Sequence, residues 1–228
     1  MQDNRFPGGQ PQGITQTQTG TSLDSSAASV LKNTYMLLGL TIAFSAVVAF
    51  FSMNMPRPHF LIILAGFYGL FFLTAKLRNS PWGIVSTFAL TGFMGYTLGP
   101  LIGMFAGAGA MGIVTDALGL TAMVFFGLSA YALVTKKDFS FLSGFLMAGF
   151  VVLIGAMVLS LFTDISGLHL AISCGFVLFS SAAILYETGN IIHGGERNYV
   201  MATIGLYVSI YNIFVSLLSI LSSLSGDD

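Results

Sequence analysis

Long apolar runs alternate with short polar breaks along most of this chain. Seven such runs, each of about 17 to 25 residues, are long enough to cross the roughly 30 Å hydrocarbon core of a bilayer as α-helices. Nearly all charged residues fall in the breaks between them. The predicted spans are Tyr35–Met53, His59–Ala75, Trp82–Phe105, Ala117–Val134, Phe141–Phe162, Leu168–Ile192 and Tyr199–Leu221.

The fold class follows from the chemistry of lipid. Lipid offers the backbone no hydrogen-bond partner, so a chain crosses a bilayer either as helices or as a closed barrel. Barrel strands show alternating polarity over segments of about 10 residues, and this chain has no such alternation. We therefore predict an all-α polytopic membrane protein, with a tail of residues 1–28 and a seven-helix transmembrane bundle of residues 29–228.

The composition narrows the classes of partner. Of the 228 residues, 55% are hydrophobic and 7% are charged, against about 25% charged in an average soluble domain. A net charge of −1 gives no attraction to nucleic acid, so we expect none as a partner. The single cysteine, Cys174, is predicted to be a small buried apolar residue.

The basic residues predict how the bundle is oriented. Seven of the eight lie on the side of the N-terminus, and Arg57 alone lies on the other side. Positive charge favours the cytoplasmic side of a membrane, which predicts a cytoplasmic N-terminus and an external C-terminus. The seven are Arg5, Lys32, Lys76, Arg78, Lys136, Lys137 and Arg197.

Two segments outside the spans have distinctive compositions. Residues 1–28 are rich in Gln, Thr, Gly, Ser and Pro, and cannot bury enough apolar surface to offset chain entropy. They are predicted to be a disordered cytoplasmic tail, which is either an inert leader or a segment that a cytoplasmic partner grips. Residues 106–116 form a Gly/Ala-rich connection, predicted to be either a flexible loop or a partly re-entrant turn.

Small residues recur on one face of the third span. Gly95, Gly99, Gly103 and Gly107 are spaced four apart, and such faces let helices approach closely in lipid. Pro100 lacks a backbone donor and is predicted to kink the helix. The pattern fits either simple close packing or a hinge beside a ligand path.

Glu187 lies inside the sixth apolar run, where an acidic side chain is costly unless it is protonated, paired or hydrated. It is either a functional residue or a rim residue that reaches headgroup water. The neighbours expected on the last helix are Ser209 and Asn212. Lys76 or Arg78, at the inner end of the second helix, is the expected cationic neighbour. These five residues form the candidate polar or ion site.

The last span carries an unusual number of polar residues for a transmembrane helix. Its serines at seven-residue spacing, together with nearby polar positions, indicate either hydrogen bonds between helices or the lining of a polar cavity. The residues of this stripe are Ser209, Asn212, Ser216, Ser219 and Ser223.

The sequence contains no motif for a common catalytic site. It lacks the HExxH, Walker A and G-x-S-x-G patterns. Its histidines, His59, His169 and His193, fall at span ends on different sides of the membrane, so they cannot share a metal. We expect no catalytic residue, cofactor or metal in this protein.

Four segments resemble the Bax inhibitor-1 family. They are Gly92–Leu101, the loop Lys136–Leu142, Ile184–His193 and Leu206–Leu218, and the resemblance extends over about residues 30 to 224. Shorter stretches are similar to a bacterial inner-membrane branch of the family. These stretches are Leu31–Tyr35, His169–Ser173 and Ile191–Glu196.

The resemblance implies a seven-helix bundle with its last helix near the centre, and two possible functions. In the bacterial branch it implies binding to the membrane-anchored, ATP-dependent FtsH protease, as an inhibitor or competing substrate. In calcium-leak members it implies two Asp residues on the sixth and seventh helices and an Arg latch. The matching positions here are Glu187 and Ser209, with Lys76 or Arg78 as latch, so the acidic pair is incomplete. A calcium or proton leak is therefore the alternative.

Overall fold

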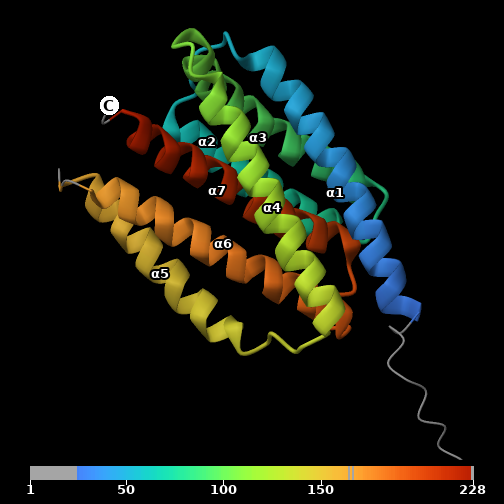
Figure 1. Ribbon diagram of the computed structural model, residues 1–228. Coiled ribbons are helices and arrows are strands. Elements are labelled where there is room, and N and C mark those ends of the chain that lie inside the picture. Colours follow the sequence, from blue (N-terminus) through green and yellow to red (C-terminus); the bar gives the residue numbers. More distant parts are fainter. Residues whose placement is uncertain (1–24, 164, 166, 227–228) are drawn as a thin grey trace, which may run out of the picture.

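The computed structural model describes residues 25–163, 165 and 167–226, and this described part consists of seven α-helices and no strand (Figure 1). All seven helices are long and apolar enough to cross a membrane, which confirms the predicted fold class. The helices are α1 (Ser25–Ser52), α2 (Phe60–Leu77), α3 (Trp82–Gly107), α4 (Met111–Thr135), α5 (Leu142–Ser160), α6 (Leu168–Ile192) and α7 (Tyr199–Ser225).

The largest departures from the predicted boundaries are at the starts of α1 and α4. Helix α1 begins at Ser25, ten residues before the predicted span, and so includes residues 25–28 of the predicted tail. Residues 1–24 of that tail lie outside the described residues. Helix α4 begins at Met111, so the predicted loop or re-entrant turn of residues 106–116 was wrong. The connection shortens to residues 108–110, where Gly109 takes a positive φ of 71° to turn the chain.

Helix α7 lies at the centre of the bundle (Figure 1). It packs against α1, α3, α4 and α6. Leu206, Ile204 and Ile213 in its middle are completely buried, and Leu218 nearly so. Because buried side chains lie on several faces of α7, the other helices surround it, as the family resemblance implied.

The glycine stripe of α3 packs directly against α1. A Cβ at Gly95 would collide with the backbone oxygen of Ser45, one at Gly99 with that of Ala49, and one at Gly103 with that of Met53. Gly95, Gly99 and Gly103 therefore allow α1 and α3 to pack closely, which agrees with the first of the two interpretations of the glycine pattern. The helix continues without interruption through Pro100, which is itself buried.

Helices α2 and α5 lie at the periphery of the bundle. Helix α2 packs against α3, and α5 packs against α6. Helix α5 contains no buried residue, and α2 contains only Thr74. Many of their large apolar side chains are therefore exposed to lipid, whereas others, such as Phe67 and Ile154, line a cavity inside the bundle.

Cys174 corrects one sequence prediction. It is exposed on the surface of α6 rather than buried. The apolar run around it gave no sign of which face of α6 would pack, because all faces of that stretch are apolar.

Candidate functional site

A cavity of about 640 Å³ lies between α2, α3, α5, α6 and α7. Its wall toward α2 and α5 is built from apolar and aromatic side chains. Its wall toward α6 and α7 carries the polar groups of Ser180, Glu187, Ser209 and Asn212. The cavity, called the carboxylate cavity below, is therefore polar on one side and apolar on the other.

Glu187 provides the only carboxylate among the residues that line this cavity. Its Oε2 is buried and has no hydrogen-bond partner among the residues that the structure describes. On α7 the side chain faces Gly205, where an added Cβ would collide with the carboxylate oxygens. Gly205 thus makes the room that a glutamate needs between two packed helices. A carboxylate without a donor in this setting can accept a hydrogen bond or meet a cation.

Ser209 and Asn212 lie on the same wall as Glu187. The Ser209 hydroxyl donates a 3.0 Å hydrogen bond to the Gly205 carbonyl, one turn earlier on α7. The structure therefore brings together three of the five residues of the predicted polar site.

Ser180 is a cavity residue that the sequence analysis missed. Its Oγ is buried, and no described residue forms a hydrogen bond with it. It lies on α6 two turns before Glu187, and that seven-residue spacing puts both on one helix face. This spacing was the signal that could have identified it.

Lys76 and Arg78 do not line the carboxylate cavity. They lie at the end of α2, in the segment that leads into the α2–α3 loop. There the backbone carbonyl of Arg78 accepts a 3.0 Å hydrogen bond from Nδ2 of Asn198, the residue that caps α7. No basic side chain is found among the described residues that line the cavity around Glu187.

The rest of the polar stripe on α7 mostly serves contacts within and between helices. Ser173 on α6 donates a 3.1 Å hydrogen bond to Ser219. Ser223 bonds to the Ser219 carbonyl within its own helix, and Ser216 is buried. Only the Ser209 and Asn212 end of the stripe reaches the carboxylate cavity.

The α4–α5 loop closes one end of α6. Phe139 is buried in a cluster with Ala132 and Ile192, and a Cβ at Gly189 would press on its ring. The exposed Asp138 accepts a 2.8 Å hydrogen bond from the backbone N–H of Ser140. That bond, the Ser140 hydroxyl and nearby His193 hold the pKa of Asp138 below its usual value.

The chain is similar to several bacterial proteins over nearly their whole length. It is 62% identical to an uncharacterized protein of Pseudomonas aeruginosa, over 93% of this chain and 97% of the relative. It is 55% identical to "Modulator of FtsH protease YccA" of Escherichia coli K12, over 94% of this chain and 98% of the relative. An "Uncharacterized membrane protein" of Vibrio cholerae is 44% identical over 87% of this chain and 91% of the relative.

The same protein of a second E. coli strain is named "Inner membrane protein YccA". The seven apolar helices agree with that location, so the chain is a multi-pass protein of the bacterial inner membrane. The family described as "Inhibitor of apoptosis-promoting Bax1" matches residues 27–226, which include all of α2 to α7 and nearly all of α1. On these grounds the chain belongs to the Bax inhibitor-1 family.

Proposed function

We propose that this protein is a modulator of the membrane-bound, ATP-dependent FtsH protease, and that it acts by binding rather than by catalysis. The observation that carries the proposal is the 55% identity to the E. coli FtsH modulator, which extends over nearly the full length of both chains. At this similarity the helical bundle is shared, so a shared partner in the membrane is expected.

The structure supports a specific mode of action, in which the protein competes with other substrates. Residues 1–24 are polar and precede α1 directly. A protease that pulls on this segment would have to extract α1 first. Helix α1 is held by the glycine stripe of α3, and Ser45 in its middle hydrogen-bonds to Tyr207 of α7. Such a substrate engages readily and is extracted slowly, and meanwhile it occupies the protease.

Co-purification tests the proposal. The C-terminally tagged protein, expressed at its native level, should retain FtsH through solubilisation of native membranes in a mild detergent. An unrelated seven-helix inner-membrane protein with the same tag is the control. A pulse–chase experiment should show slower decay of a second FtsH substrate when this protein is overexpressed. Failure of FtsH to co-purify, together with an unchanged decay rate, would contradict the proposal.

A cation leak is the second candidate, and the unpartnered Oε2 of Glu187 in the carboxylate cavity favours it. The cavity wall carries serine at position 209 where a second acid would complete the pair, and no basic side chain of the described lining faces Glu187. We therefore rank a calcium or proton leak below protease modulation. Flux into liposomes that is lost in Glu187→Gln but kept in Glu196→Gln would reverse this ranking.

A further inference from the structure

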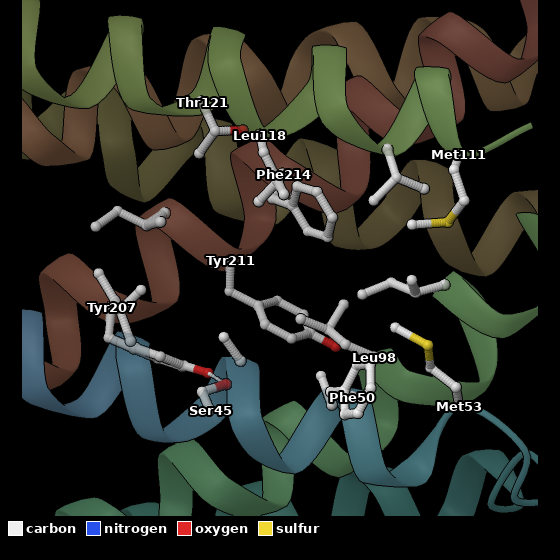
Figure 2. A pocket seen from close by; sticks show the side chains of 16 residues that line it. Ser45, Phe50, Met53, Leu98, Met111, Leu118, Thr121, Tyr207, Tyr211 and Phe214 are labelled. Atoms are coloured by element: carbon white, nitrogen blue, oxygen red, sulfur yellow. Dashed lines mark hydrogen bonds between the residues drawn. The ribbon is translucent and has the colours of Figure 1, made fainter. Parts of the chain in front are cut away.

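A second cavity, of about 290 Å³, lies between α1 and α4 and has α7 as its floor (Figure 2). It is lined mainly by residues within Ile42–Met53, Met111–Thr121 and Tyr207–Phe214. We call it the α1–α4 slot. Nothing in the protease or leak mechanisms uses it.

The slot is suited to an apolar ligand. Each hydroxyl group on its wall already has a partner within the protein. The hydroxyls of Ser45 and Tyr207 lie 2.6 Å apart, and Tyr211 lies 2.9 Å from the Thr97 hydroxyl. Thr121 donates a 2.7 Å hydrogen bond to a carbonyl of its own helix. The remaining lining residues are aliphatic, aromatic or methionine, so a ligand in the slot would bind through van der Waals contacts rather than hydrogen bonds.

The slot has the length of one membrane leaflet. It extends along α1 from Met53 to Ile42, and along the antiparallel α4 from Met111 to Thr121. Eleven residues at about 1.5 Å each give roughly 16 Å. This is about half of the roughly 30 Å hydrocarbon core of a bilayer. The slot therefore begins at one rim of the bundle and ends near mid-membrane depth.

Lipid has direct access to the slot from the side. Phe50 and Leu118 at its mouth are 64% and 55% exposed, whereas Val114 and Phe214 at its floor are buried. An empty apolar slot forfeits dispersion contacts along its walls. Water does not fill an apolar cavity well, because it finds too few polar partners there. An extended hydrocarbon chain from the surrounding lipid needs no hydrogen-bond partner and restores those dispersion contacts, so it is the fitting occupant.

The positively charged Arg57 at the rim end of the slot can bind the phosphate group of a phospholipid. Arg57 lies in the α1–α2 loop, four residues after Met53, and is exposed. Arginine binds phosphate through charge-assisted hydrogen bonds, and lipid phosphates lie at the level of such rim loops.

We propose that the α1–α4 slot binds one acyl chain of a phospholipid from the leaflet at its rim end, and that Arg57 binds the phosphate of that lipid. This lipid is a bound ligand with a defined position, distinct from the exchanging lipids around α2 and α5. It replaces protein side chains along α1 and α4 and so completes the packing around α7.

Photolabelling in lipid nanodiscs tests this proposal. The wild-type protein is reconstituted with phosphatidylglycerol that carries a photoreactive diazirine at the end of one acyl chain. Labelled residues are then mapped by mass spectrometry. The label is expected to concentrate at the deep end of the slot, around Ser45 and Thr121, well above the level found on α5.

Two phenylalanine substitutions on α1 separate specific binding from general lipid contact. Ala46 lines the slot, whereas Ala43 is exposed on the same helix outside it. The new ring in Ala46→Phe should fill the opening of the slot, and photolabelling of slot residues should fall to the level measured on α5. Ala43→Phe, which adds the same ring, should leave labelling unchanged. If Ala46→Phe is poorly folded, Leu118→Trp blocks the mouth from α4 and takes its place.

Arg57→Gln tests the phosphate contact. It should lower labelling of the slot, while Arg57→Lys should retain much of it. Labelling that is uniform over α5 and the slot, or that survives the blocking substitutions, would overturn the acyl-chain site. A second copy of the chain cross-linked across the slot would also overturn it. Unchanged labelling in Arg57→Gln would overturn the assignment of the headgroup.

Discussion

Tyr207 joins three helices through a single hydroxyl group. It lies 2.6 Å from the Ser45 hydroxyl of α1 and donates a 3.2 Å hydrogen bond to the Thr91 carbonyl of α3. Both contacts are buried, so neither competes with water. One residue of the central helix thereby fixes the positions of two neighbours.

Tyr207→Phe should destabilise the bundle by about 1 kcal/mol, because hydrogen bonds between transmembrane helices are worth roughly that amount or less. The measurement is equilibrium unfolding in detergent micelles. Tyr68→Phe removes a hydroxyl from an exposed tyrosine of α2 and is the control. Equal stability of the two variants would show that the Tyr207 hydroxyl contributes nothing to helix packing.

Asp138 makes the α4–α5 loop sensitive to acid. Its pKa is lowered in the folded protein because the ionised carboxylate accepts hydrogen bonds from Ser140. The stabilisation is therefore present above the ordinary value of 3.8 and is lost as the pH falls through the lower, folded value. The amide resonance of Ser140 should titrate with a midpoint below 3.8. In Asp138→Asn the resonance should not shift with pH, and a wild-type midpoint at or above 3.8 would contradict the prediction.

At the scale of helices, the interface of α1 and α3 depends on the absence of side chains. Gly99→Ala should lower stability by about 1 to 3 kcal/mol, the usual cost of overpacking. The new Cβ would meet the backbone of α1, which cannot move without displacing the helix. The measurement is again unfolding in micelles.

Gly107 offers a matched control, since it belongs to the same four-residue repeat but has open space where a Cβ would be added. Gly107→Ala should be close to neutral. If Gly99→Ala and Gly107→Ala proved equally stable, the close contact between α1 and α3 would not be a determinant of stability.

The helices were predictable from the sequence to different degrees. Helix α6 begins and ends at the predicted residues, because polar segments mark both of its ends. Helix α4 begins six residues before its predicted start at Ala117, because Asp116 interrupts the apolar run without interrupting the helix. Hydropathy detects the part of a helix that crosses lipid, whereas helices continue into the interface wherever the backbone stays hydrogen-bonded.

The sequence predicted three polar residues of the candidate site, but not Ser180 and not the position of the basic residues. The grouping of Glu187 with Ser209 and Asn212 followed from polar residues on two consecutive helices, and the structure shows these three on one cavity wall. The prediction that Lys76 or Arg78 lies beside Glu187 was wrong, because it depended on how the helices are arranged around α6. No periodicity in a sequence encodes that order.

At the scale of the whole molecule, orientation in the membrane is a prediction from charge. With a cytoplasmic N-terminus and seven spans, a reporter fused after Asp228 lies outside the cytoplasm. Alkaline phosphatase at that position should be active, and green fluorescent protein should be dark. Fusions after Lys137 in the α4–α5 loop should give the reverse pattern. An active phosphatase at Lys137 would refute the orientation.

The N-terminal segment should control the lifetime of the protein. Deletion of residues 2–24 should slow degradation by FtsH in cells, because the protease would lose the polar segment by which it begins extraction. A variant with the same segment scrambled should be degraded like the wild type, since composition rather than sequence is proposed to matter. A chase experiment with and without active protease gives both rates. An unchanged rate for the deletion would end the competing-substrate mechanism while leaving binding through the helices open to the co-purification test.

The central position of α7 has a consequence for biosynthesis, because α7 leaves the ribosome after the six other helices that the structure describes. While translation proceeds, α1, α3, α4 and α6 enter the membrane without the helix against which all of them pack. The hydroxyl groups of Ser45 and Thr121 then face an unfilled space where Tyr207 and its neighbours will lie. The nascent bundle therefore closes only once α7 has entered the membrane, and a chain terminated before Tyr199 remains open to quality-control enzymes of the membrane.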